Sequence, residues 1–248
     1  MIKLKNVSVR YKKGEVHAIN NLSLSFEKGE FVCVLGKSGA GKSTFIRCIN
    51  GIQKPTTGEV VINNTSLLNL KEKELRVVRS NIGMIFQQNY LIPRLTVFQN
   101  VITGTFGKRK AWKNLLGVFT DEEKERSNRA LRAVELENLT ERRVEQLSGG
   151  QIQRVGIARA LVQKPYVILG DEPVASLDIS TSIKIFKLLE KIHKEKQIVT
   201  IINVHDVQLA KRFATRIVAL KNGEVIFDGA PGELTRDVMN QIYDSEWD

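Results

Sequence analysis

The sequence contains little cysteine and lacks a long apolar run. Its two cysteines, Cys33 and Cys48, have neither a CxxC spacing nor the spacing of a metal site. This excludes a disulfide framework, and we expect both residues to be reduced thiols in the core, where free cysteine behaves as a small hydrophobe. No apolar stretch approaches the ~18 residues that a membrane-spanning helix requires.

The first residues also lack the apolar block of a signal peptide. The opening MIKLKNVSVRYKKGE alternates apolar and charged residues, which is typical of a strand. We therefore expect the chain to be made and kept in the cytosol.

Acidic residues are too few to balance the basic ones. The 38 Lys and Arg against 27 Asp and Glu give a formal net charge of +11. A basic surface favours nucleic acid, anionic lipid or an acidic partner. The sequence has no zinc-finger spacing, no RNP aromatic pattern and no arginine-rich tail, so no nucleic-acid partner is expected.

Hydrophobic periodicity predicts an α/β fold. Residues 2–10 and 16–26 alternate as strands, and Gly29 marks a turn after them. FVCVLG (31–36) and IGMIF (82–86) are continuous apolar runs, typical of strands buried on both faces of a parallel sheet.

From about residue 96 to residue 164 strand signals give way to helical ones. After Pro165 the strands return as YVILG, IVTII and RIVALKNGEVIFDG, the last with a hairpin signal at Asn222-Gly223. Ile183, Phe186, Leu189 and Ile192 recur at helical spacing between them. The pattern predicts an α/β core with a mostly helical insertion.

The motif GKSGAGKS follows a buried strand and opens a helix predicted over 42–50, as a phosphate-binding loop requires. Its backbone N–H groups would surround phosphate oxygens at the positive end of that helix. Lys42 would reach the β and γ phosphates, and the Ser43 hydroxyl would ligate Mg²⁺. The expected nucleotide contacts are Gly36, Lys37, Ser38, Gly39, Ala40, Gly41, Lys42, Ser43 and Thr44.

Two acids end the apolar strand of YVILGDEP, at the sheet edge where open α/β folds bind ligands. Asp171 is suited to hold Mg²⁺, usually through a water. Glu172 is suited to polarise a water that attacks the γ-phosphate.

A second glycine pair occurs in LSGGQIQR. Ser148 and Gln151 match a capping box, which would account for a helix start without any ligand. A cap does not require Gly149 and Gly150, however, and each glycine costs about 1 kcal/mol in a helix. Two residues without side chains at the positive N-terminal end of a helix favour the close approach of an anion. That anion would be a nucleotide held by another molecule.

Taken in order, GKSGAGKS, FQQ, LSGGQIQRVGIARAL, ILGDEP, ASLD and VHD resemble an ATP-binding cassette (ABC) ATPase over essentially the whole chain. The resemblance implies one ABC domain, residues 1–248, with a P-loop NTPase (RecA-like) α/β core in 1–95 and 165–248. It also implies an N-terminal antiparallel β subdomain and an inserted helical subdomain, 96–164. ATP and Mg²⁺ are the implied cofactors, and a second copy of the chain is the implied partner.

By position, the resemblance assigns further roles. Tyr11 would stack on adenine, and Gln87 would sense Mg²⁺ and the attacking water. Asp178 would communicate across a head-to-tail dimer in which Ser148, Gly149, Gly150 and Gln151 close over the partner's ATP. His205 would contact the γ-phosphate.

Three residues depart from the common family pattern. Alanine is more usual at Gly170 and at Gly156, and proline is common at Ile179. None of the three removes a catalytic group.

An aromatic, basic stretch intervenes at 106–119, with Lys108, Arg109, Lys110 and Lys113 around Trp112. Such an insertion is similar to that of phosphonate-import ATPases, including phosphite relatives. It implies a transmembrane permease, an extracytoplasmic phosphonate-binding protein and a peripheral location on the cytoplasmic face of the membrane. The alternatives are an importer or exporter ATPase for another solute, or a non-transport ABC ATPase acting on nucleic acid.

Within this insertion, five residues are too apolar for a solvated loop: Trp112, Leu115, Leu116, Val118 and Phe119. We expect them to pack on the helical subdomain, on the membrane subunit or near the anionic cytoplasmic leaflet.

Overall fold

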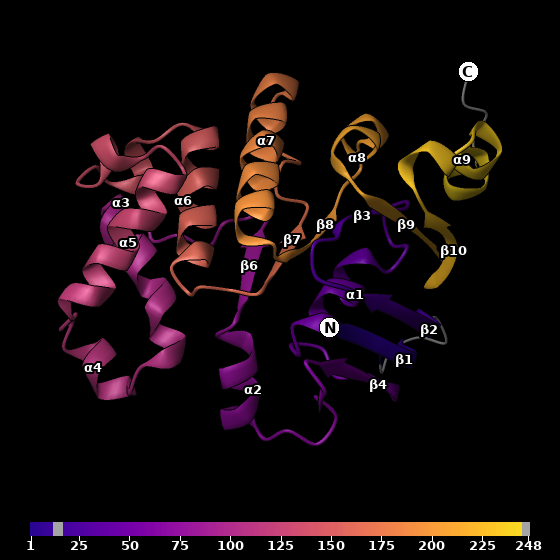
Figure 1. The fold of residues 1–248 in the computed structure, drawn as a ribbon, viewed down its shortest axis with the longest axis horizontal. Coiled ribbons are helices and arrows are strands. Elements are labelled where there is room, and N and C mark those ends of the chain that lie inside the picture. Colours follow the sequence, from indigo (N-terminus) through magenta and orange to yellow (C-terminus); the bar gives the residue numbers. More distant parts are fainter. Residues whose placement is uncertain (12–16, 245–248) are drawn as a thin grey trace.

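The computed structural model describes residues 1–11 and 17–244, and all structural statements below refer to these residues. Two sheets and a layer of helices form the molecule (Figure 1). The strands are β1 (Ile2–Arg10), β2 (His17–Phe26), β3 (Phe31–Leu35), β4 (Thr57–Ile62), β5 (Thr65–Ser66), β6 (Ile82–Phe86), β7 (Val167–Asp171), β8 (Val199–Asn203), β9 (Arg216–Lys221) and β10 (Glu224–Gly229).

The larger sheet has the strand order β10-β9-β3-β8-β7-β6. Strands β9, β3, β8, β7 and β6 are parallel, and β10 pairs antiparallel to β9 across the Asn222-Gly223 turn. The smaller sheet, β2-β1-β4-β5, is antiparallel throughout. This arrangement confirms the expected α/β core with an N-terminal antiparallel sheet.

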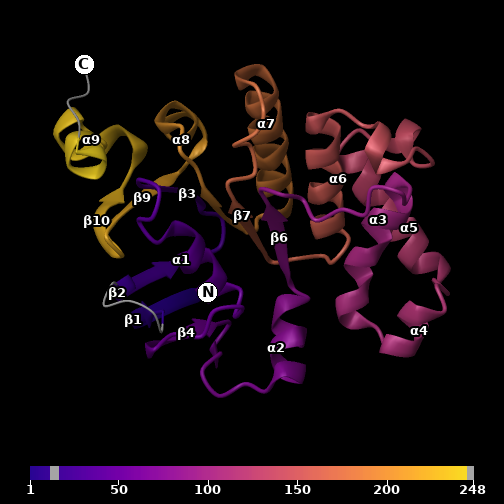
Figure 2. The same ribbon diagram turned by 180° about the vertical axis from the view of Figure 1, so that it is seen from behind.

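The helices fall into two groups along the chain. Those of the core are α1 (Lys42–Ile49), α2 (Glu72–Arg79), α7 (Ile179–Lys196), α8 (Val207–Phe213) and α9 (Arg236–Tyr243). Those between β6 and β7 are α3 (Val97–Ile102), α4 (Ala111–Leu115), α5 (Asp121–Ala133) and α6 (Gly149–Leu161), with 3-10 turns between them. Seen from either side, this second group lies beyond α7 at one end of the molecule (Figures 1 and 2).

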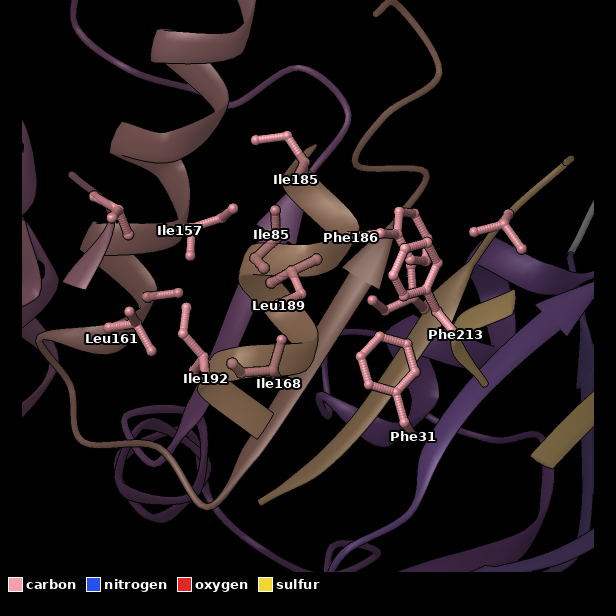
Figure 3. Packing of buried hydrophobic residues seen from close by; sticks show 14 of the residues in the cluster. Phe31, Ile85, Ile157, Leu161, Ile168, Ile185, Phe186, Leu189, Ile192 and Phe213 are labelled. Atoms are coloured by element: carbon pink, nitrogen blue, oxygen red, sulfur yellow. The ribbon is translucent and has the colours of Figure 1, made fainter. Parts of the chain in front are cut away.

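Alternate residues of the central strands face two different cores. On β3, Phe31, Cys33 and Leu35 contact the cluster beneath α6, α7 and α8, whereas Val32 and Val34 contact the cluster beneath α1 and the antiparallel sheet. In the first cluster the ring of Phe186 packs at a tilt against those of Phe31 and Phe213, with ring centroids 6.3 and 5.3 Å apart (Figure 3). Burial on both faces explains the continuous apolar runs that predicted these strands.

The two cysteines are free and buried, as expected, and burial raises the pKa of the Cys48 thiol to about 12. Strands β4 and β5 were not anticipated, because TGEVVI is short and flanked by turn residues. Among the described residues there is no helix long and apolar enough to cross a membrane.

Candidate active site

The phosphate loop joins β3 to α1 and is pressed against neighbouring backbone. A Cβ on Gly36 would lie 2.3 Å from the Leu220 carbonyl oxygen, and one on Gly41 would lie 2.3 Å from that of Ala18. Both glycines also have positive φ, 146° and 103°. Only glycine satisfies both demands, so the packing of β2 and β9 fixes the path of the loop.

Lys42 curls over this loop and is buried. Its Nζ donates hydrogen bonds to the carbonyl oxygens of Gly36 (2.7 Å) and Lys37 (3.1 Å). Burial lowers the pKa of Lys42, and the charges of Glu172 and Asp171 act in the opposite direction. The ammonium thus lies against the backbone of the loop.

Asp171, the last residue of β7, is oriented by two donors. Ser43 Oγ donates to its Oδ1 at 2.8 Å, and Asn203 Nδ2 donates to the same oxygen at 2.9 Å. Asn203 ends the adjacent strand β8 and is fully buried. Asn203 was not predicted from the sequence, although a polar side chain that ends an apolar strand is a recognisable signal.

Glu172 follows with a left-handed backbone, φ 52°. This turn directs its carboxylate over the loop, with Oε1 2.6 Å from His205 Nε2 and 3.9 Å from Lys42 Nζ. The Glu172 side chain is 18% exposed and that of His205 47%. The carboxylate therefore keeps contact with solvent while two nitrogen groups hold it.

A cavity of about 290 Å³ opens above the loop and is also lined by Tyr11 and Glu172. Tyr11 Oη lies 3.1 Å from Thr44 Oγ1, and its half-exposed ring borders the cavity. The ring therefore borders the same cavity as the loop, and its contact with adenine stays a prediction.

Gln87 is exposed and follows β6 directly, in register with Glu172, since Phe86 pairs with Asp171. The loop after it is held by Arg159 of α6, which donates to the carbonyl oxygens of Tyr90 (2.8 Å) and Asn89. A Cβ on Gly156 would lie 2.5 Å from Asn89 Oδ1. A glycine at position 156, where the family pattern has alanine, leaves room for this loop. The role of Arg159 was not predicted from the sequence.

The second glycine pair begins α6 in a different place. Ser148 caps the helix, accepting from Gln151 N (3.4 Å), while its own N–H donates to Gln151 Oε1 (2.9 Å). These residues line a separate cavity of about 500 Å³ together with Asp178, the N-cap of α7. Thr181 donates to Asp178 through N (2.9 Å) and Oγ1 (2.6 Å), which lowers the pKa of that carboxyl.

Gly150 also has a packing role inside this chain. A Cβ there would lie 2.7 Å from Thr181 Cγ2. The close approach of an outside anion at this glycine stays a prediction. The structure brings Tyr11, the phosphate loop, Asp171, Glu172 and His205 together, but it leaves Ser148 and Asp178 at another cavity.

The sequence profile of the ABC transporter family matches residues 19–175, which is more than half of the chain. The chain belongs to the ABC transporter family. This match confirms the resemblance drawn from the motifs.

Curated relatives cover the chain end to end. The phosphonates import ATP-binding protein PhnC of Wolinella succinogenes is 46% identical over all of this chain and 90% of its own length. The protein of the same name from Staphylococcus aureus is 46% identical over 98% of this chain and 94% of its own.

Solved ABC cassettes share the fold. A dimeric cassette in a post-hydrolysis state, bound to ADP and phosphate, is 40% identical and superposes with a TM-score of 0.82, covering 93% of this chain and 99% of its own. CbiO1 of Clostridium perfringens, part of an ABC transporter complex, is 31% identical with a TM-score of 0.83, over 97% and 92% of the two chains.

Within this ABC cassette, Gly170 also has a packing reason. A Cβ there would lie 3.1 Å from Ile202 Cγ2 and 3.3 Å from Pro173 Cγ, which is tighter than ordinary contact. The alanine that is usual before the acidic pair would crowd β8 in this chain. Nothing in the structure explains Ile179, which is exposed at the start of α7.

Proposed function

We propose that this chain is the ATP-hydrolysing subunit of an ABC importer for phosphonates, a cargo class to which phosphite also belongs. The observation that carries the ATPase assignment is the assembly of Lys42, Ser43, Asp171, Glu172 and His205 around one loop. The names of the relatives and the basic, aromatic insertion at 106–119 support the phosphonate class.

The loop would bind the phosphates of ATP, and Tyr11 would stack on the adenine. Ser43 Oγ and Asp171 Oδ1 lie 2.8 Å apart and fit a hard cation that takes oxygen ligands, so Mg²⁺ would be held there. The described residues contain no group of three or more His, Cys, Asp or Glu that could hold a metal, so phosphate oxygens and waters would complete the shell. When bound, Mg²⁺ would neutralise charge on the β and γ phosphates.

Hydrolysis would depend on what Glu172 and His205 do around the γ-phosphate. ATP on the loop would draw Lys42 and His205 toward phosphate oxygens, which would release the Glu172 carboxylate. That carboxylate would then orient the attacking water and accept its proton, with Gln87 beside it. Asn203 and Ser43 would keep the Asp171 carboxylate aimed at the cation.

A second copy of the chain would complete each site. Ser148, Gly149, Gly150 and Gln151 line a cavity apart from the phosphate loop of their own chain. In a head-to-tail dimer this cavity would cover the ATP on the partner's loop, with α6 directing its positive end at the phosphates. Asp178, at the same cavity, would then transmit closure across the dimer.

Closure would reach the membrane through the loop that follows Gln87. Arg159 fixes this loop to α6, so a movement of the helical subdomain would carry the loop with it. We infer that permease subunits dock here, at the cytoplasmic face of the membrane. A phosphonate-binding protein on the outside would deliver the cargo, which this chain need not contact.

The test is ATP hydrolysis by the chain reconstituted with its permease, with a binding protein that is either empty or loaded with methylphosphonate. We expect the loaded protein to stimulate hydrolysis over the empty one. Hydrolysis that ignores methylphosphonate but answers to another solute would remove the phosphonate assignment and leave the ATPase. An absence of ATP hydrolysis under all conditions would remove both.

A further inference from the structure

Four large apolar side chains are exposed on one short segment of the helical subdomain. Trp112 is 57% exposed, Leu115 89%, Leu116 65% and Val118 62%. They lie on and just after α4, between η1 (Thr103–Lys108) and α5. The chain therefore holds a cluster of apolar surface that its own fold does not cover, which marks an interaction site.

The base of this segment is fixed. Arg76 of α2 donates to the carbonyl oxygens of Phe106 (2.8 Å), Gly107 (3.2 Å) and Arg109 (3.1 Å). Lys108 Nζ donates to the carbonyl oxygen of Gln163 at 2.7 Å. Hydrogen bonds from two sides thus hold the segment in a defined position on the molecule.

The inner side of the segment is also packed. Phe119 stacks on Phe106 with ring centroids 6.1 Å apart and 11° between the planes. The Arg109 guanidinium lies over Phe119 at 4.6 Å, and its Nε is 3.1 Å from Glu123 Oε1. Of the five apolar residues singled out in the sequence, only Phe119 packs on the helical subdomain as expected. The other four project outward.

The polar surroundings of the exposed cluster are basic. Lys108, Lys110, Lys113 and Trp112 line a cavity of about 360 Å³, and Glu123, the one acid in its lining among the described residues, is paired with Arg109. No Asp or Glu occurs between Glu74 and Asp121 in the sequence. The surface thus combines exposed apolar groups with four cations in 108–113, which no acid accompanies before α5 begins at Asp121.

Cations near this cavity lie close together and have unsatisfied hydrogen-bond donors. Burial, and then the charges of Arg126 and Lys164, lower the pKa of Lys108, so like charges are gathered here. Within the described structure, Arg109 Nη1 and Arg126 Nε are buried without a hydrogen-bond partner. An anion near this cavity would relieve the repulsion, because it would supply the missing opposite charge.

The cluster lies away from the proposed dimer contact. In both views α6 begins at the upper edge of the molecule and α4 lies at the lower corner of the helical subdomain (Figures 1 and 2). A second copy that covers the start of α6 would leave α4 uncovered, so a second copy is not its occupant.

We propose that one surface segment, the α4 tip, docks on an anionic phospholipid membrane. The α4 tip consists of Lys108, Lys110, Trp112, Lys113, Leu115, Leu116 and Val118. Lys110 and Lys113 would contact headgroup phosphates, while Lys108 holds the base of the segment through Gln163. Trp112 with its apolar neighbours would enter the interface between headgroups and acyl chains. This combination of basic and aromatic side chains is typical of interfacial segments, whereas a protein-binding patch has fewer lysines at its centre. The inference does not depend on which solute the transporter carries.

Co-sedimentation of the full chain with vesicles tests the proposal. Vesicles of phosphatidylglycerol and phosphatidylcholine should bind the chain, pure phosphatidylcholine should bind it at least roughly tenfold more weakly, and salt should reduce the difference. A Lys110→Glu/Lys113→Glu variant and a Leu115→Ser/Leu116→Ser variant should each lose most of this binding. ATP hydrolysis by the isolated chain should stay unchanged, because these residues lie outside the nucleotide site.

Matched control variants make the same kinds of substitution, of charge and of apolar side chains, outside the α4 tip. Lys187→Glu/Lys191→Glu alters the same charge on the exposed face of α7, and Ile52→Ser removes an exposed apolar side chain near α1. Both should bind anionic vesicles as the unaltered chain does. Equal binding to both vesicle types, or equal losses in these controls, would overturn the proposal. So would tip variants that bind vesicles normally but fail to assemble with the permease.

Tryptophan fluorescence gives a second, independent readout. The chain has two tryptophans, and a Trp247→Phe variant leaves Trp112 as the single reporter. Its emission should shift to shorter wavelength with phosphatidylglycerol vesicles and not with phosphatidylcholine alone. An unchanged spectrum with anionic vesicles would contradict insertion of the tip.

Discussion

Glu172 combines a strained backbone with a polar environment built from three elements. Its φ of 52° is rare for a residue other than glycine and costs about 1–3 kcal/mol. The strain directs the carboxylate toward Lys42 on α1 and His205 after β8. Strain of this kind persists where the surrounding structure fixes it, here at the end of a central strand.

We expect Glu172→Gln to bind ATP and to accumulate as a closed dimer. The amide keeps the size and the hydrogen-bonding reach of the side chain but cannot accept a proton from water. Turnover should therefore fall by about two to four orders of magnitude. Size-exclusion chromatography with ATP, beside a steady-state phosphate assay, measures both effects.

Glu195→Gln, on the exposed end of α7, is the matched control and should leave turnover unchanged. Substantial steady-state hydrolysis by Glu172→Gln would contradict the role assigned to the carboxylate. Loss of ATP binding in that variant would instead indicate that Glu172 contributes to the binding of ATP before hydrolysis.

At the scale of elements, the start of α6 is packed against the start of α7. Gly150 has room for no side chain because Thr181 Cγ2 occupies the space. The same Thr181 donates through Oγ1 to Asp178. One contact therefore serves both the internal packing and the surface proposed to meet a second copy.

Gly150→Ala should destabilise the chain by about 1–3 kcal/mol, because the new methyl group overpacks this contact. Adding Thr181→Ser removes the clashing methyl group and keeps the hydroxyl, so the double variant should recover most of the stability. Urea unfolding of both variants measures the difference.

ATP turnover separates the two reasons for this glycine. If the bare backbone also approaches a partner's nucleotide, the double variant should fold well and still hydrolyse ATP slowly. Full activity in the double variant would leave internal packing as the sole reason for Gly150.

His193 links α7 to β8 in the core. It is buried, its Nδ1 lies 3.2 Å from Thr200 Oγ1, and its ring meets the edge of Phe31. Burial lowers the pKa of His193 below its usual value of 6.5. Below about pH 6.5 the unfolded chain therefore takes up a proton that the folded chain does not.

The free energy of unfolding should accordingly fall as the pH drops from 7.5 toward 5.5, by at most about 1.4 kcal/mol per pH unit from this one group. His193→Gln cannot take up this proton, so its stability should fall less over the same window. Urea titrations of both proteins at several pH values test this. Parallel curves would show that His193 does not contribute.

At the scale of the whole molecule, the phosphate loop and the Ser148 cavity are separate sites in one chain. Each is half of a nucleotide site in the head-to-tail arrangement that we propose. The arrangement has a consequence that a single-chain mechanism does not share. Two different inactive variants should rescue each other when mixed.

Lys42→Ala and Ser148→Arg should each be inactive alone. In a mixed dimer, the intact loop of one chain faces the intact Ser148 cavity of the other, which restores one site of two. Because about half of randomly formed dimers are mixed, activity should return to about a quarter of the original. Phosphate release from an equal mixture measures it, and a mixture as inactive as its components would contradict the pairing.

Much of the fold could be predicted because apolar periodicity is a local property. The runs at β3, β6, β7 and β8 are mostly apolar on both faces, because helices or a second sheet cover both faces. Strands β4 and β5 were not predicted, since a short strand with one covered face leaves a weak pattern. The exposure of the α4 tip could not be predicted from the sequence, because apolar character does not say which side chains the fold will cover.

Of the nucleotide site, the sequence by itself determined the residue types that chemistry demands at fixed spacing: the glycine loop, Lys42, the acidic pair and the cap at Ser148. It determined these because each acts through its own backbone or an adjacent strand end. Only the tertiary structure decided which residues from distant parts of the chain lie in contact. It joined Asn203 to Asp171 and His205 to Glu172, placed Thr181 against Gly150, and left the α4 tip exposed. Such contacts link residues that are far apart in the chain, and no local pattern encodes them.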